Sequence, residues 1–168
     1  MANKTVAEQI AETRKALFDE ALLSEQYEEL EALQGPDDPT FLEDMVNQFL
    51  KDMKLFFNQV GKELEKATLD AQVLGKVLHQ IKGCTASIGA KQLYIICNQL
   101  REHVHSGEIE RCREAFVQMD NQLALLDKRL GVYFELCREV QPEVTDGFPS
   151  PSSGGDSVAN DGVKGEGK

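Results

Sequence analysis

The sequence lacks the features that mark membrane-spanning and secreted proteins. Its 168 residues include no tryptophan, and no apolar run approaches the ~20 residues that a membrane-spanning helix needs. The N-terminus, MANKTVAEQIAETRK, is polar and lacks the apolar core of a signal peptide. We therefore expect the chain to stay on the cytosolic side of the membrane, and its small size predicts that it diffuses between cytoplasm and nucleus.

Basic residues are also scarce. The chain carries 18 lysines and arginines against 29 aspartates and glutamates, for a formal net charge of -11. A nucleic-acid backbone and an anionic membrane surface both attract basic protein surfaces. The charge balance therefore argues against nucleic acid and against a membrane as partners.

Metal and nucleotide motifs are missing as well. None of the four cysteines forms a C-x-x-C pair, and all fall on helical apolar patterns, which predicts reduced and buried thiols. His103 and His105 are two residues apart, so on a helix they point to roughly opposite sides and make a poor zinc site. A metal-dependent bundle enzyme would need inward-facing Glu-x-x-His motifs, and ATP binding would need G-x-x-x-x-G-K-[ST] or G-x-G-x-x-G. We expect neither a metal site inside the bundle nor an ATP site, and hence no cofactor and no metal. The cysteines are Cys84, Cys97, Cys112 and Cys137.

The clearest pattern that is present is helical. Apolar residues between 112 and 137 recur at alternating spacings of four and three, an unbroken heptad seam that is typical of a long helix in a bundle. We predict a helix over about 110–138. The seam consists of Cys112, Phe116, Met119, Leu123, Leu126, Leu130, Tyr133 and Cys137.

Similar spacings predict three more bundle helices, over about 40–66, 70–87 and 90–105. The first begins at a start signal in which either Asp38 with Pro39 or Thr40 with Glu43 would cap the helix. Short breaks at SIGA and HSGE make successive helices antiparallel neighbours.

The sum is an all-α fold, an antiparallel four-helix bundle with shorter helices around 5–20 and 23–34 capping one end. The helical domain spans 1–140. The remaining segment, 141–168, contains three Pro, six Gly and four Ser with few apolar residues. Such a segment cannot bury enough surface to offset its chain entropy, so we predict a disordered C-terminal tail.

His79 lies on the solvent side of the predicted helix 70–87. At 100° per residue the apolar side chains gather on one side, and His79 points almost directly away from them. Gly75 and Gly83 lie one turn before and after it, and Ala86 lies two turns after it. Two glycines cost a helix roughly 2 kcal/mol relative to alanine, so we infer that another molecule approaches the imidazole closely. The apolar side consists of Leu74, Val77, Leu78, Ile81, Thr85 and Ile88.

Lysines flank this histidine. Lys76 and Lys82 lie at i−3 and i+3, diagonally on each side of His79. A neutral, exposed imidazole is a nucleophile, and nearby cations favour a product that carries about two negative charges. The pattern suits a histidine that accepts a phosphoryl group. It leaves open an incidental surface histidine on a non-catalytic helical adaptor protein.

The stretch HQIKGCTASIGA resembles the plant-type histidine-containing phosphotransfer (HPt) family, whose pattern is close to H-Q-x-K-G-S-S-x-S-x-G-A. The segment LLSEQYEELEALQGPDDPTFLEDMVNQFL is also similar to that family, and the resemblance covers roughly 15–138. It implies a four-helix bundle that has no kinase activity of its own. Such a protein takes a phosphoryl group from an aspartate in the receiver domain of a hybrid sensor kinase and passes it to an aspartate of a response regulator. The partner receiver supplies Mg²⁺, and in plants the relay serves cytokinin signalling between cytoplasm and nucleus.

Residue by residue, the resemblance makes His79 the phosphoacceptor, Lys82 the lysine beside the phosphate, Gly83 the small neighbour and Gln80 the glutamine after the histidine. Pseudo-members of the family replace the histidine, and this chain retains it. One departure is Cys84-Thr85 in place of the usual Ser-Ser. Because both residues fall toward the core, we expect changed packing or helix-internal hydrogen bonding there rather than lost chemistry.

Overall fold

The computed structural model describes residues 4–140 and contains no strand within them. The predicted all-α class is therefore confirmed, while the predicted tail over 141–168 lies outside the described residues. The helices are α1 (Val6–Asp19), α2 (Glu25–Leu33), α3 (Phe41–Glu65), α4 (Ala71–Ile88), α5 (Lys91–Ser106) and α6 (Ile109–Val140).

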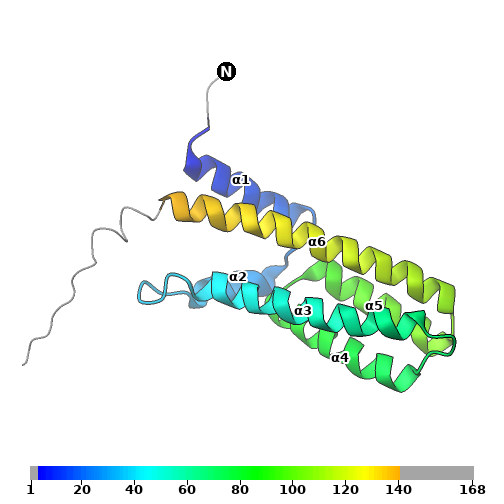
Figure 1. Cartoon of the computed structure of the whole chain (residues 1–168). Helices are drawn as coiled ribbons and strands as arrows, with labels where there is room; N and C mark the ends of the chain where they lie inside the picture. The colour runs from blue at the N-terminus through cyan, green and yellow to red at the C-terminus, as the bar shows by residue number, and fades with distance from the viewer. Residues whose placement is uncertain (1–3, 141–168) are drawn as a thin grey trace, which may run out of the picture.

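Helices α3, α4, α5 and α6 form the bundle (Figure 1). Each packs against its neighbours in the ring α3–α4–α5–α6, and α6 closes the ring on α3, so that α4 and α6 lie diagonally opposite each other. At 1.5 Å per residue the 32 residues of α6 span about 48 Å, longer than its partners. Helix α1 packs along the part of α6 that extends past the bundle, and α2 packs on α4 (Figure 1). The two short helices therefore cap one end, as predicted.

The core face of α4 is the one that its sequence predicts. Its buried residues are Leu74, Val77, Leu78, Ile81, Thr85 and Ile88. Four of these are 0% exposed, so α4 is held at one rotation about its axis by α3 and α5. At roughly 1.5–3 kcal/mol for each fully buried large aliphatic side chain, rotating this face toward solvent would cost about as much as a domain's usual net stability.

The seam of α6 is buried for the most part, with a shift that the strict heptad did not predict. Ala115 and Phe134 are buried, whereas Phe116 and Tyr133 only pack against the edge of the core. A straight α-helix has 3.6 residues per turn, so a heptad seam drifts around it, and α1 covers a second face of α6 near its end.

The prediction of buried cysteines holds for two of the four. Cys97 and Cys112 are buried, whereas Cys84 and Cys137 are only partly covered because they lie at the edges of their helices' apolar faces. All four thiols are free. Burial raises the pKa of each of them, and that of Cys97 to about 11.

The start of α3 confirms Thr40 rather than Asp38 as the N-cap residue, but without the predicted side-chain cap. Thr40 is the N-cap residue, but its hydroxyl donates to the Asp44 carboxylate at 3.0 Å and accepts nothing from the helix. Its backbone has φ −103 and ψ 5 rather than the extended conformation that lets an N-cap side chain turn back onto the first turn. Gln34, from the preceding connection, accepts a hydrogen bond from the Leu42 amide at 2.9 Å instead.

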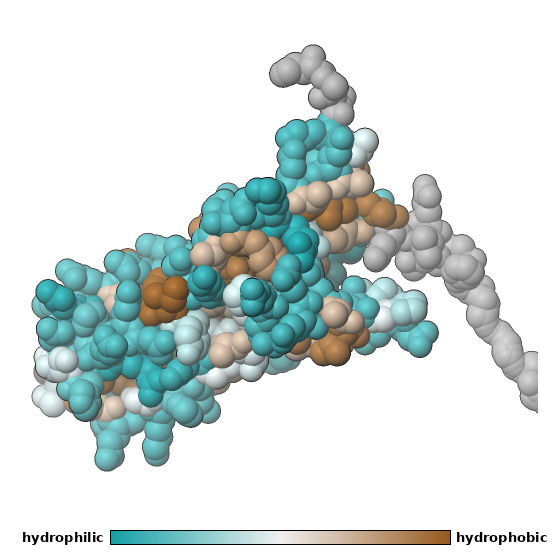
Figure 2. Space-filling view, turned by 180° about the vertical axis from the view of Figure 1, so that it is seen from behind, coloured by the Kyte–Doolittle hydropathy of each residue, from teal (hydrophilic) through white to brown (hydrophobic). Residues whose placement is uncertain are grey.

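On the face that Figure 2 shows, apolar side chains are scattered rather than gathered. Figure 2 shows a mostly hydrophilic face with small, separate apolar patches. The most exposed large hydrophobic residues, Leu33, Leu55 and Val117, belong to three different helices. In the described part of the chain, no helix is both long enough and apolar enough to span a membrane.

Gly89, the C-cap residue of α4, holds the end of α4 against the start of α2. It has φ +81, and its carbonyl accepts from the Ser24 amide at 2.9 Å. A Cβ at this position would lie 2.6 Å from the backbone nitrogen of Tyr27. Glycine is therefore required twice here, once for the left-handed conformation and once for the close approach of the α2 backbone.

We predict that Gly89→Ala lowers the free energy of unfolding by clearly more than Gly107→Ala does. Gly107 is also a left-handed C-cap, with φ +72, but a Cβ there would meet nothing within 4 Å. Gly107→Ala should cost only the left-handed strain, about 1–2 kcal/mol. Urea unfolding of both variants gives the comparison, and equal losses would show that the α2–α4 contact is loose.

Candidate functional site

His79 stands on a ridge of α4 between two surface depressions. Its side chain is exposed, on the face of α4 opposite the buried residues. Gly75 and Lys82 line a depression on the α5 side, and Gln80 and Gly83 line one on the α3 side. The structure thus brings these four predicted site residues together around His79, but divides them between two surfaces of different chemistry.

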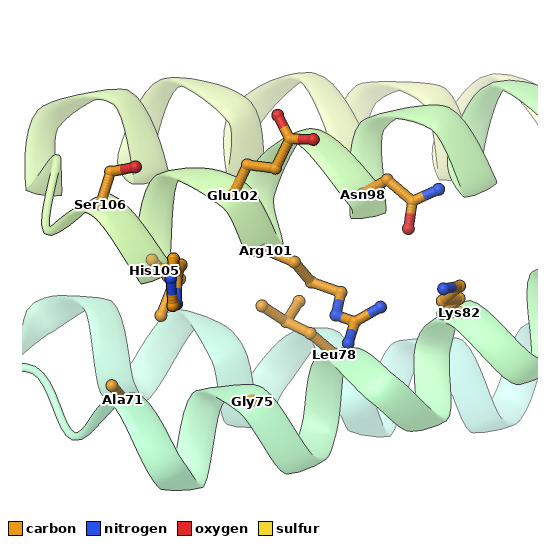
Figure 3. Close-up of a pocket in the computed structure, with 10 residues that line it drawn as sticks. Ala71, Gly75, Leu78, Lys82, Asn98, Arg101, Glu102, His105 and Ser106 are labelled. Atoms are coloured by element: carbon orange, nitrogen blue, oxygen red, sulfur yellow. The ribbon is translucent and has the colours of Figure 1, made fainter.

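The α5-side depression is cationic at the end where Lys82 lies. It has a volume of about 720 Å³, and its floor includes Gly75 and Leu78. Figure 3 shows Arg101 reaching from α5 toward the part of the depression that contains Lys82, while the carboxylate of Glu102 is turned away from α4. Lys82 is half-buried, one helical turn from His79. Lys82 and Arg101 thus place two cations on the α5 side of the helical turn that carries His79.

Arg101 is the residue that sequence reasoning missed. It lies 22 positions after His79 on another helix, and only the register between α4 and α5 brings it to the depression. That register is fixed by buried contacts, among them the Cys97 thiol, which donates to the Leu78 carbonyl at 3.3 Å. The sequence offered only a weak signal for this second cation, namely an arginine in the helix that was predicted to pack beside 70–87.

The α3-side depression is an apolar groove of about 500 Å³. Phe49 and Phe56 from α3 and Ile88 from α4 contribute most of its large apolar side chains. Gln80 and Gly83 form its edge next to His79. A molecule that covers His79 from this side would therefore bury apolar surface within one turn of the imidazole. The groove is lined by Met45, Gln48, Phe49, Asp52, Phe56, Gln80, Gly83, Cys84, Ser87 and Ile88.

The two glycines beside His79 have no packing role. A Cβ at Gly75 or at Gly83 would meet no atom within 4 Å. Gly61, in contrast, packs against Phe116 in the interface between α3 and α6, at 3.4 Å from an added Cβ. The small residues at 75 and 83 therefore leave open space next to the imidazole, as the helical wheel predicted.

Two predicted site residues lie farther from the depressions. Lys76 is exposed and Ala86 is exposed, and neither lines the cationic depression or the apolar groove. Lys76 is on the α3 side of His79 and Lys82 on the α5 side, because they lie at i−3 and i+3. Of the two lysines, Lys82 shares its surroundings with a second cation.

Cys84-Thr85 is accommodated without disturbing α4. Thr85 is fully buried, and its hydroxyl donates within the helix to the Ile81 carbonyl at 2.9 Å and the Lys82 carbonyl at 3.0 Å. Cys84 is half-buried in the apolar groove. The hydroxyl at 85 thus needs no partner outside its own helix.

The remaining two histidines lie on α5, near its C-terminus. The ring nitrogen Nδ1 of His103 lies 3.0 Å from the Glu108 carboxylate, at the C-terminus of α5. His105 lines the α5-side depression, and its Glu102-x-x-His105 spacing lies on the surface rather than in the bundle interior. Within residues 4–140, no group of three or more His, Cys, Asp or Glu side chains is arranged to hold a metal ion.

Comparison with known families agrees with this geometry. A model of the Hpt domain matches residues 44–129, about half of the chain, from the first turn of α3 into α6. This chain belongs to the Hpt domain family. Members of this family are phosphotransfer mediators in two-component signalling, and their role there is that of a phosphorelay intermediate.

Individual relatives match most of the chain. It is 34% identical over 113 residues to histidine-containing phosphotransfer protein 4 of Arabidopsis thaliana, which covers 67% of this chain and 89% of that protein. It is 31% identical over 142 residues to pseudo histidine-containing phosphotransfer protein 2 of Oryza sativa subsp. japonica, which covers 84% of this chain and 94% of that protein.

Solved structures show the same fold. A histidine-containing phosphotransfer protein from Medicago truncatula superposes with a TM-score of 0.79 at 24% identity, over 83% of this chain and 95% of that one. The maize protein gives a TM-score of 0.77, also at 24% identity, over 82% of this chain and 100% of that one. The predicted four-helix bundle is confirmed.

The relatives include proteins with and without the word pseudo in their names, at similar levels of identity. Overall similarity therefore does not say which kind of member this chain resembles in activity. The residue that bears on the question is the exposed imidazole of His79.

We predict that Gly83→Ala raises the free energy of unfolding by about 0.5–1 kcal/mol, because the new methyl group enters open space and alanine favours the helix. Gly131→Ala on α6 is the matched control, since a Cβ there also meets nothing within 4 Å. Both should gain similar stability in urea unfolding. A loss of stability only at position 83 would mean that this glycine serves packing.

Proposed function

We propose that this chain accepts a phosphoryl group on His79 from an aspartate in the receiver domain of a hybrid histidine kinase and passes it to an aspartate of a response regulator. The observation that carries the proposal is the placement of His79. Its imidazole is exposed on α4, between small residues that leave it open and beside a depression that holds Lys82 and Arg101.

The reaction requires little of this chain beyond an aimed nucleophile. The lone pair of one ring nitrogen of His79 attacks the phosphorus of the aspartyl phosphate. The P–O bond to the carboxylate breaks and its electrons stay on the carboxylate, while a P–N bond forms. The second ring nitrogen gives up its proton to solvent. Onward transfer to a response regulator reverses these steps, because an acyl phosphate and a phosphoramidate are both energetic. Positioning and charge stabilisation therefore supply most of the catalysis.

Lys82 and Arg101 are the groups of this chain suited to the negative charge of the phosphoryl oxygens. Hydrogen bonds from cations to phosphate oxygens are roughly twice as strong as neutral ones. Lys82 is anchored on the helix that carries His79, and Arg101 approaches from α5 (Figure 3). We expect the partner receiver domain to bring Mg²⁺ to the acceptor aspartate.

Docking would place the partner over His79 and the apolar groove between α3 and α4. The groove offers the partly exposed side chains of Met45, Phe56 and Cys84 for burial. The relatives from rice and Arabidopsis, named pseudo histidine-containing and histidine-containing phosphotransfer proteins, support a role in phosphotransfer, and we propose that the relay is of the plant cytokinin type. A relay of that type would operate in the cytoplasm and the nucleus, and the net charge of -11 supports protein partners rather than nucleic acid or membrane.

A non-catalytic adaptor is the alternative, and the relatives named pseudo histidine-containing phosphotransfer proteins favour it. The two functions share the docking surface and differ only in chemistry at His79. Incubation with a phosphorylated receiver domain separates them, because a phosphohistidine is labile in acid and stable in alkali. An adaptor would bind the receiver and acquire no such label.

We predict that His79→Gln abolishes phosphoryl acceptance from a labelled receiver domain and leaves the helical content unchanged. The side chain touches no part of the core, so its loss affects the nucleophile alone. His103→Gln and His105→Gln are the matched controls and should still be labelled. Label that persists in His79→Gln and disappears in one of the controls would move the acceptor to that histidine.

We predict that Lys82→Ala slows transfer and shortens the lifetime of the phosphohistidine by about tenfold, as the loss of one charge-assisted hydrogen bond implies. Lys76→Ala should have a smaller effect, because Lys76 lies outside the cationic depression. The readouts are the transfer rate and the decay of label after the donor is removed. Equal effects of the two substitutions would contradict a specific role for Lys82.

A further inference from the structure

We propose that Asp52 selects the receiver domain, by requiring a lysine or arginine of the partner opposite it in the apolar groove between α3 and α4. This inference rests on the proposed function, since the partner is the receiver that transfers to His79. It concerns which receivers fit this surface.

Asp52 is the one charged side chain among the ten residues that line the groove. It lies on α3 and faces the part of α4 that carries Cys84. The pKa of the Cys84 thiol is raised mainly by burial and further by the charge of Asp52, which agrees with this proximity. Every other lining side chain is apolar, small or uncharged. A partner that covers the groove therefore meets apolar or uncharged polar surface everywhere except at this carboxylate.

The carboxylate is only partly satisfied within its own chain. Asp52 is half-buried, and the Gln48 side-chain amide donates to its Oδ1 at 3.0 Å. None of the ion pairs formed within residues 4–140 includes Asp52. Lys54, two residues along α3, pairs instead with Asp127 of α6 at 3.3 Å. One neutral hydrogen bond does not offset the charge of a carboxylate that is removed from water.

Docking of a receiver domain would remove water from the Asp52 carboxylate. A receiver that presents an apolar or acidic side chain over Asp52 leaves a desolvated, unpaired charge, whereas one that presents a lysine or arginine restores a partner. The groove therefore favours any partner that brings apolar surface, and it distinguishes one receiver from another only at the position opposite Asp52. Such discrimination by an unfavourable contact gives specificity without requiring tight binding to any receiver.

The charge pattern around His79 also fixes the orientation of the partner. Lys82 and Arg101 lie on the α5 side of the ridge, and Asp52 lies on the α3 side. A receiver whose phosphoryl-bearing aspartate approaches the imidazole would place the acidic residues around that aspartate next to Lys82 and Arg101. Its basic residue would then fall over the groove, and the opposite orientation would bring like charges together on both sides.

The test uses a phosphorylated receiver domain of a hybrid histidine kinase as donor and the full chain as acceptor. The acceptors are wild type, Asp52→Asn, Asp52→Lys and, as a matched charge reversal, Asp120→Lys. Asp120 is exposed on α6, which lies diagonally opposite α4. On the donor side, each lysine or arginine around the acceptor aspartate is changed to glutamate, one at a time, and the transfer rate is measured for every pair.

We expect Asp52→Lys to slow transfer from the unaltered receiver by at least about tenfold. One lysine or arginine reversal on the receiver should slow transfer to wild type similarly. The transfer rate from that reversed receiver to Asp52→Lys should recover to within about threefold of the rate between the unaltered receiver and wild type. Asp120→Lys should transfer normally and rescue no reversal. If Asp52→Lys does not fold by circular dichroism, Asp52→Asn should show a several-fold slower rate and a weaker salt dependence.

The proposal is overturned if Asp52→Lys and Asp52→Asn transfer at the wild-type rate, or if a slowed Asp52→Lys is rescued by no receiver reversal. A wild-type chain that takes no label on His79 from any receiver would overturn the proposed function as well. A labelled wild type without rescue overturns the role of Asp52 alone.

Discussion

The rotation of α4 about its own axis is the constraint on which the site depends. Leu74, Leu78 and Ile81 are completely buried between α3 and α5, and no other rotation of the helix buries them together. An α-helix has a fixed 100° step, so burying this face sends His79 outward. The hydrophobic core thus aims the nucleophile without any direct contact with it. The α2–α4 junction at Gly89 then holds the end of the same helix.

The same constraint explains which parts of the molecule could be predicted from sequence. The bundle helices, the core face of α4 and the exposure of His79 follow from local periodicity, which burial enforces in the folded chain. The N-cap residue of α3, Thr40, was one of the two predicted, but the side chain that accepts from the first turn is Gln34, which lies in a connection that carries no capping pattern. Arg101 was missed because its place depends on the register between two helices. Contacts that depend on how separate helices are aligned are not encoded at any fixed spacing.

The site also shows how a small bundle divides its functions. The α5 side of the His79 ridge presents Lys82 and Arg101, and the α3 side presents an apolar groove with Asp52 in it. One side is suited to the phosphoryl group and the other to the partner protein. The glycines between them keep both sides accessible at a cost of roughly 1 kcal/mol each in helix stability. In a chain with a net charge of -11, two of the 18 lysines and arginines thus lie where phosphate charge would arise.

The most direct measurement of the central claim is the position of the label after transfer. The full chain is incubated with a phosphorylated receiver domain, digested at alkaline pH, and the labelled peptide is identified by mass spectrometry. Our account predicts a single acid-labile phosphoryl group on His79. Label on His103 or His105, or stable receiver binding with no label on any histidine, would contradict it.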